Sequence, residues 1–105
     1  MNKEMLKGTI DLLILSLLDQ EDSYGYQISK KIKDKTEGTF LIQEGTLYLS
    51  LKRLENNEAI SSYWGEKSQG GRRKYYKITE EGKRQFSQIT NDWKHVVHIV
   101  NRFIP

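Results

Sequence analysis

Apolar positions recur at helical spacing near the start of the chain, which predicts a helix over residues 4–19. One face of this helix consists of Leu6, Ile10, Leu13, Ile14, Leu17 and Leu18. A second apolar stripe beside it consists of Met5, Gly8, Leu12 and Leu15. A helix that is apolar on two sides is buried on two sides, so in this short chain the second stripe is a candidate for contact with another subunit.

Two further helices are predicted before the middle of the chain. The first begins after Asp22 or Ser23, either of which can cap it, and ends near Gly38. The second begins at residue 43 or 44 and ends at 57. Its inward positions are Leu47, Leu51 and Leu54, and its outward face carries Gly45, Leu49, Lys52 and Asn56, flanked by Tyr48 and Arg53. This outward face is unusual for simple solvation, although a single exposed leucine is also common.

A β-hairpin follows, with strands predicted over 60–66 and 73–78, because both segments are rich in aromatic and β-branched residues. The turn between them is basic, and Gly70 and Gly71 tolerate positive φ there. The short apolar segment 40–42 is expected to add a brief third strand, because a lone hairpin is only marginally stable.

A long helix over 80–103, capped by Thr79, ends the pattern. Its apolar positions alternate at spacings of three and four and consist of Phe86, Ile89, Trp93, Val96, Val100 and Phe103. This is a heptad seam, and it extends beyond what a small domain can cover. We therefore predict a dimer interface made of these six residues together with Met5, Leu12 and Leu15.

These elements predict a single domain over 1–105 that is mainly α with a small β-hairpin, an α+β fold. Residues 4–79 form a winged helix-turn-helix, whose hairpin is the wing, and residues 80–104 form a C-terminal dimerisation helix. Hydrophobic residues make up 36% of the chain, so a lone copy would have a thin core. The absence of cysteine excludes disulfides and thiolate metal sites. The longest apolar stretch is too short to span a bilayer, so we expect no membrane association and a cytoplasmic, nucleoid-associated protein.

The net charge of +3 is unevenly distributed along the chain. Residues 1–22 carry a charge of −3, residues 23–79 carry +5, and the wing segment 67–77 holds five basic side chains and no acid. A concentrated basic segment suggests a polyanion partner, and the alternative is a solvated basic loop.

The pattern of three helices and a basic wing fits DNA, because an α-helix enters the major groove while a basic loop reaches the backbone. The alternative is a winged-helix adaptor that binds protein without sequence-specific DNA binding. An enzyme is the weakest option, because no nucleophile, base and orienting group stand at a catalytic spacing. His95 and His98 are spaced as some metal pairs are, but without a third ligand we expect no metal site and no cofactor.

Two residues carry open alternatives at this stage. Trp93 is either an anchor of the dimer interface or the aromatic wall of a pocket that stacks a planar ligand. Asp11 either points to water beside Lys7 or faces a dimer cavity, where it would attract cationic ligands.

Several motifs resemble the PadR family of bacterial transcriptional regulators. They are Tyr24-Gly25-Tyr26-Gln27-Ile28, Glu44-Gly45-Thr46-Leu47-Tyr48, Leu51-Lys52-Arg53-Leu54-Glu55 and the most specific run, from Gly70-Gly71-Arg72-Arg73-Lys74 to Glu81-Gly82. The length resembles the short subfamily. Lys3-Glu4-Met5-Leu6, Ser61-Ser62-Tyr63-Trp64-Gly65 and Trp93 resemble its multidrug-sensing repressors.

The resemblance implies a homodimeric repressor that binds palindromic operator DNA and is released by a small aromatic or drug-like ligand. The expected DNA contacts are Tyr24, Tyr48, Leu49, Lys52, Arg53, Lys67, Ser68, Gly70, Gly71, Arg72, Arg73 and Lys74. The expected ligand contacts are Trp93, Met5, Gly8, Asp11, Leu12, Ser16 and Val97. Val97 stands where the drug-binding pattern carries an acid, so Asp11 is the expected substitute.

Overall fold

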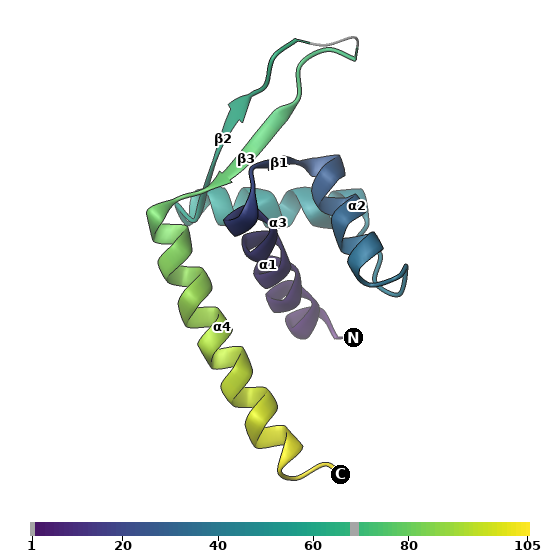
Figure 1. The fold of residues 1–105 in the computed structure, drawn as a ribbon, viewed down its shortest axis with the longest axis vertical. Helices are drawn as coiled ribbons and strands as arrows, with labels where there is room; N and C mark the ends of the chain where they lie inside the picture. Colours follow the sequence, from purple (N-terminus) through teal and green to yellow (C-terminus); the bar gives the residue numbers. More distant parts are fainter. Residues whose placement is uncertain (1, 68–69) are drawn as a thin grey trace.

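The structure is a computed structural model, which describes residues 2–67 and 70–105. Within these residues, four helices accompany a small three-stranded antiparallel sheet whose hairpin projects from the helices, which confirms the predicted α+β fold (Figure 1). The helices are α1 (Lys3–Gln20), α2 (Gly25–Lys35), α3 (Glu44–Asn56) and α4 (Glu80–Asn101). The strands are β1 (Ser23–Tyr24), β2 (Ile60–Trp64) and β3 (Lys74–Ile78), in the order β1-β3-β2.

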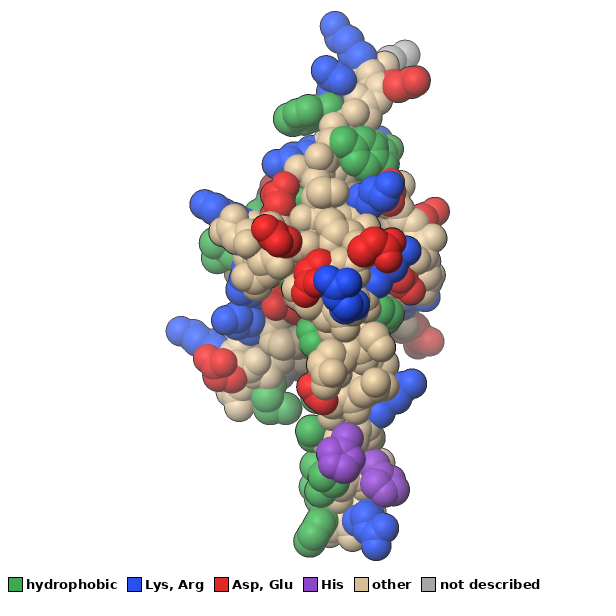
Figure 2. All heavy atoms as spheres, turned by 90° about the vertical axis from the view of Figure 1, so that its left-hand side faces the viewer, with side chains coloured by type: hydrophobic (Ala, Val, Ile, Leu, Met, Phe, Trp, Pro, Cys, Tyr) green, Lys and Arg blue, Asp and Glu red, His purple; other side chains and the backbone are tan. Residues whose placement is uncertain are grey.

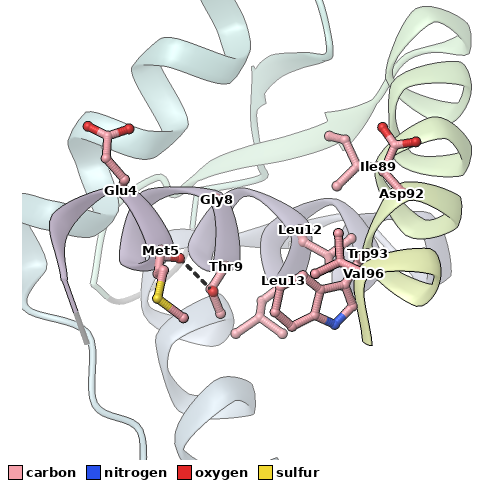
Figure 3. A pocket seen from close by; sticks show the side chains of 10 residues that line it. All are labelled: Glu4, Met5, Gly8, Thr9, Leu12, Leu13, Ile89, Asp92, Trp93 and Val96. Atoms are coloured by element: carbon pink, nitrogen blue, oxygen red, sulfur yellow. Dashed lines mark hydrogen bonds between the residues drawn. The ribbon is translucent and has the colours of Figure 1, made fainter. Parts of the chain in front are cut away.

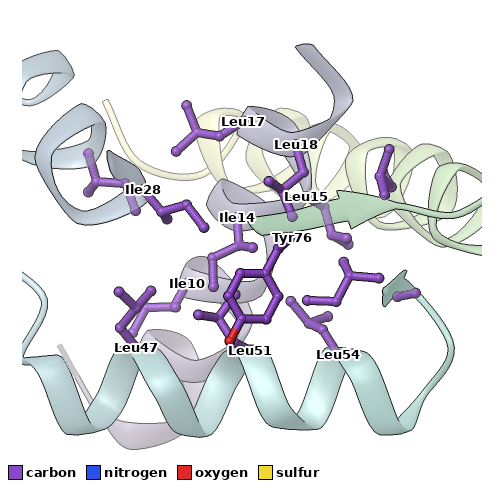
Figure 4. Packing of buried hydrophobic residues seen from close by; sticks show 14 residues of the cluster. Ile10, Ile14, Leu15, Leu17, Leu18, Ile28, Leu47, Leu51, Leu54 and Tyr76 are labelled. Carbon is purple, nitrogen blue, oxygen red and sulfur yellow. The ribbon is translucent and has the colours of Figure 1, made fainter. Parts of the chain in front are cut away.

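The core forms where α1, α2 and α3 meet the sheet. The inward faces predicted for α1 and α3 supply about half of its buried side chains, and Tyr76 of β3 lies among them (Figure 4). Ile10 and Ile14 of α1 and Leu51 of α3 are almost completely buried. Each such side chain contributes roughly 1.5–3 kcal/mol through burial, and together they hold α3 with its opposite face outward.

The third strand is not where the sequence predicted it. Residues 40–42 form no strand, and β1 takes the third place through the pairs Ser23–Tyr76 and Tyr24–Tyr75. The segment 40–42 instead packs Phe40 and Ile42 against the core. The predicted cap of α2 was also wrong, because Tyr24 is the N-cap and its backbone N–H donates to Gln27 Oε1 at 3.2 Å.

The start of α4 is fixed against the end of α3. Thr79 caps α4 as predicted, since its Oγ1 accepts from Gly82 N at 2.9 Å and donates to Glu58 O at 2.6 Å. A Cβ built on Gly82 would lie 1.9 Å from Ala59 O, so only glycine permits this close approach. From there α4 leaves the body and ends far from the wing, in a molecule 53 Å long (Figure 1).

The far half of α4 carries an apolar row on one side and both histidines on the other (Figure 2). In the part of the chain that the structure describes, no helix is long and apolar enough to cross a membrane.

Candidate nucleic-acid interface and cavity

The outward face of α3 is exposed as predicted. Leu49 is 67% exposed, and Tyr48 and Lys52 are exposed beside it. The Tyr48 hydroxyl lies against the first residue of α2, because a Cβ on Gly25 would be only 2.7 Å from it. These three residues therefore form one surface on α3, which is the candidate helix for recognising DNA bases.

Arg53 lies on the side of α3 that faces α1. Its Nη2 and Nε donate to the two carboxylate oxygens of Asp11 at 2.5 and 3.3 Å, and Nη2 also donates to Ser50 Oγ at 3.1 Å. The Arg53 and Asp11 side chains are only 28% and 18% exposed. Neither alternative weighed for Asp11, water or a ligand cavity, describes this position.

The basic side chains of the wing are exposed at the end of the molecule opposite the C-terminus (Figures 1 and 2). They are Lys67, Arg72, Arg73 and Lys74, while Ser68 lies outside the described residues. Gly71 has φ +89°, as the predicted turn requires, and open space surrounds a Cβ at Gly70. Arg72 Nε donates to Gly65 O at 3.2 Å, which closes the base of the turn.

Aromatic rings join the wing to the body. The rings of Tyr63 and Tyr75 stack with centroids 5.7 Å apart, and the Tyr24 ring meets Tyr75 edge-on at 5.4 Å. Tyr63 Oη donates to Asp22 Oδ2 at 2.5 Å, and this hydrogen bond raises the pKa of the Tyr63 phenol to about 12. Sequence patterns did not predict this contact, because it joins residues 41 positions apart.

A cavity of about 360 Å³ lies between α1 and α4 (Figure 3). It brings together four of the predicted ligand residues, which are Met5, Gly8, Leu12 and Trp93. The Trp93 indole and the aliphatic side chains of Leu12 and Leu13 line this same cavity (Figure 3).

The remaining predicted ligand residues lie elsewhere. Asp11 pairs with Arg53, Ser16 borders a different hollow beside α2, and Val97 is exposed on α4. Two acids that sequence reasoning missed, Glu4 and Asp92, line the cavity instead. The sequence could have identified these two acids by their positions, because Asp92 adjoins Trp93 and Glu4 lies one helical turn before Gly8.

The predicted apolar seam divides into two parts. Phe86 and Ile89 pack against the core of their own chain. Farther along, Trp93, Val96, Val100 and Phe103 are exposed, Phe103 by 82%. Leu15 is fully buried among core residues, so its predicted place at an intersubunit surface was wrong. On α1 the surface left for a partner is that of Met5 and Leu12.

Among residues 2–67 and 70–105, no three histidine or acidic side chains are grouped so that they could hold a metal ion. His95 and His98 are both exposed on α4.

Comparisons with known proteins agree with this geometry. The model of the transcriptional regulator PadR-like family matches residues 14–88. Uncharacterized protein X of Lysinibacillus sphaericus is 42% identical over 101 residues, which cover 96% of this chain and 93% of that protein. Transcriptional regulator YqjI of Escherichia coli is 31% identical over 75 residues, which cover 71% of this chain but 34% of that protein.

Solved structures are similar over the whole fold. A transcriptional regulator from Clostridium thermocellum superposes with a TM-score of 0.90 at 42% identity and covers 100% of this chain and 99% of its own. A PadR family transcription regulator from Clostridium difficile has a TM-score of 0.80 at 41% identity, covering 91% of this chain and 98% of its own. The chain belongs to the PadR-like family of transcriptional regulators.

Proposed function

We propose that this chain is a homodimeric repressor that binds palindromic operator DNA through α3 and the wing. The observation that carries the proposal is the separation of two surfaces. The basic wing lies at one end of the molecule, α3 with its exposed Leu49 crosses the middle next to the sheet, and the exposed apolar row of α4 lies toward the other end (Figure 1).

Each part of the DNA surface suits one kind of contact. Leu49 is apolar and suits a thymine methyl group, while Lys52 offers a donor to guanine or phosphate. The wing arginines suit phosphate oxygens, which position a protein without reading sequence. Arg53 is a weaker candidate for base contact than Lys52, because Asp11 already holds its guanidinium.

Dimerisation would cover the exposed part of α4. The row Trp93, Val96, Val100 and Phe103 leaves large apolar side chains in water in a single chain. Large exposed apolar patches mark interaction sites. In a two-fold dimer, the two α3 helices must match half-sites about 34–36 Å apart.

The cavity beside this row suits a planar hydrophobic effector. Leu12, Leu13 and the Trp93 indole give it an apolar wall, and Glu4 and Asp92 add negative charge at its edge. This combination favours an aromatic cation over an aromatic anion. An occupant between α1 and α4 would alter the spacing of the two α3 helices and so release the operator.

DNA selection tests the central claim. Fragments of the source genome that the purified protein retains should contain an inverted repeat, and Arg72→Ala with Arg73→Ala should weaken binding and lower the salt dependence by about two phosphate contacts. A protein that retains no fragment, or binds them all equally, would contradict operator binding, and the absence of sequence-selective retention is what a protein-binding adaptor predicts.

The oligomeric state tests the dimer. Val100→Asp should shift the protein toward monomer in sedimentation, because it buries a charge in the row. His98→Asp, on the opposite side of α4, is the matched control and should leave the dimer intact. A monomeric unmodified protein would contradict the proposal.

Fluorescence tests the cavity. In a Trp64→Phe background Trp93 is the single tryptophan, and the neutral dye N-phenyl-1-naphthylamine should quench it on binding. Further replacement of Trp93 by alanine should weaken binding of the dye, followed by the dye's own emission. Unchanged dye affinity would show that Trp93 is an interface anchor rather than a ligand wall.

A further inference from the structure

Tyr24 stands where the helix-turn-helix joins the wing. Its backbone belongs to β1 and pairs with Tyr75 of β3, and the same residue is the N-cap of α2. Its N–H donates to Gln27 Oε1 at 3.2 Å, which ties this residue to the first turn of α2. The main chain of Tyr24 is therefore held by β3 of the wing and by the first turn of α2.

The side chain of Tyr24 holds Arg73. Arg73 Nη1 donates to the Tyr24 hydroxyl at 3.0 Å, and the guanidinium carbon lies 4.6 Å from the centroid of the same ring. The ring is fixed in turn by its edge-on contact with Tyr75, on which Tyr63 stacks. A row of three aromatic rings thus supports one exposed arginine.

We propose that Tyr24 is a positioning residue that orients the Arg73 guanidinium toward a phosphate of bound DNA. This rests on the proposed function, because it assumes that the wing contacts DNA. A free arginine side chain loses rotamer entropy when it is immobilised. A guanidinium already held in place loses less on binding. The bond to Tyr24 uses one of its five N–H donors, so donors remain for a phosphate.

The positioning role and a direct DNA contact by Tyr24 predict different effects of substitution on the affinity and on its salt dependence. Arg73→Ala removes a phosphate contact, so both the affinity and the salt slope should fall, the slope by about one contact. Tyr24→Phe removes the hydroxyl and keeps the ring. Arg73 still reaches the phosphate, so the affinity should fall about three- to tenfold with the salt slope unchanged.

A double-mutant cycle on a fluorescein-labelled random-sequence DNA duplex tests the proposal. Phosphate contacts do not depend on sequence, so this probe reports them directly. Tyr24→Phe should weaken binding in the natural background and have no further effect in Arg73→Ala. Arg72 is the matched control, because its Nε bonds to Gly65 O rather than to Tyr24. Tyr24→Phe should therefore add fully to Arg72→Ala.

The outcomes separate this proposal from the one on which it rests. If the unmodified protein does not bind the duplex, both are overturned. If it binds, but Tyr24→Phe has no effect, adds fully to Arg73→Ala or lowers the salt slope, the positioning role alone is overturned. Thermal unfolding measures the stability of each variant. If Tyr24→Phe lowers the affinity in parallel with Tm, and by the same factor in the Arg73→Ala and Arg72→Ala backgrounds, the positioning role is also refuted.

Discussion

The ion pair between Asp11 and Arg53 gives the sharpest prediction for stability. Asp11→Ala removes the carboxylate that accepts two hydrogen bonds from Arg53 and leaves Ser50 Oγ as a neutral acceptor. Exposed ion pairs contribute about 0–1 kcal/mol, whereas loss of one partner of a buried pair costs about 3–5 kcal/mol. Because Arg53 keeps 28% exposure, water still reaches it, and we expect a loss of about 2 kcal/mol.

In a domain of this size such a loss lowers Tm by roughly 10 °C, measured by circular dichroism at one fixed protein concentration. The matched control is Asp34→Ala. Its pair with Lys30 also has one short bond, of 2.9 Å, but its side chains are 57% and 59% exposed. This control should leave Tm nearly unchanged, because solvent screens an exposed pair.

A second variant isolates the cause of the loss. Asp11→Leu combined with Arg53→Met removes both charges and should recover most of the stability, because no unpaired charge stays buried. The reasoning is refuted if Asp11→Ala costs no more than Asp34→Ala, or if the double variant is as unstable as the single one.

Three further predictions concern the junctions of the fold. Gly82→Ala should cost about 2 kcal/mol or more in denaturant unfolding, because its Cβ meets Ala59 O, whereas Gly8→Ala, with open space around it, should cost nothing. Thr79→Ala should cost about 1 kcal/mol through the lost cap. The hydrogen bond from Tyr63 to Asp22 needs the neutral phenol, so its contribution is complete below about pH 10 and is lost as pH rises through a pKa of about 12. In an absorbance titration Tyr63→Phe should remove one late-ionising tyrosine, and an unchanged late phase would contradict that assignment.

Helices α1, α2 and α3 were predictable because each buries an apolar face, and α4 was predictable because its apolar positions recur at helical spacing. The positions of Leu47, Leu51 and Leu54 alone indicate which side of α3 is inward, and the structure buries all three. The two-residue strand β1 was not predictable in the same way. Two residues carry no period, and the pairing of Ser23 and Tyr24 with β3 depends on segments about 50 positions away. The apolar segment 40–42 was a plausible strand by composition but is used for packing.

The candidate site was predictable where it follows helix faces and the basic turn of the hairpin. The exposure of Leu49 and Lys52 follows from the inward positions of α3. The common position of Met5, Leu12 and Trp93 at one cavity follows from the apolar stripe of α1 and the apolar seam of α4. The contacts that these side chains make with other elements of the fold could not be predicted from the sequence. A helical wheel places a side chain at an angle but does not identify the neighbour that it meets.

Leu15 shows the same limit. The apolar stripe that contains it predicts a surface for a second chain, yet the core of its own chain covers Leu15 while Met5 stays exposed. The apolar stripe lies on one side of α1 as predicted, but how deeply each of its side chains is buried depends on the angle between α1 and the elements packed against it.

In the proposed dimer, the junction before α4 determines the distance between the two reading helices. Thr79 N donates to Ala59 O at 3.0 Å, and Thr79 Oγ1 bonds to Glu58 O, so the end of α3 is tied to the start of α4 over a few atoms. If α4 joins the subunits, each α3 is carried at a fixed angle from the dimer axis. An effector between α1 and α4 would then act on operator spacing through this junction, and substitutions there should change which half-site spacing is preferred even though they touch neither DNA nor ligand.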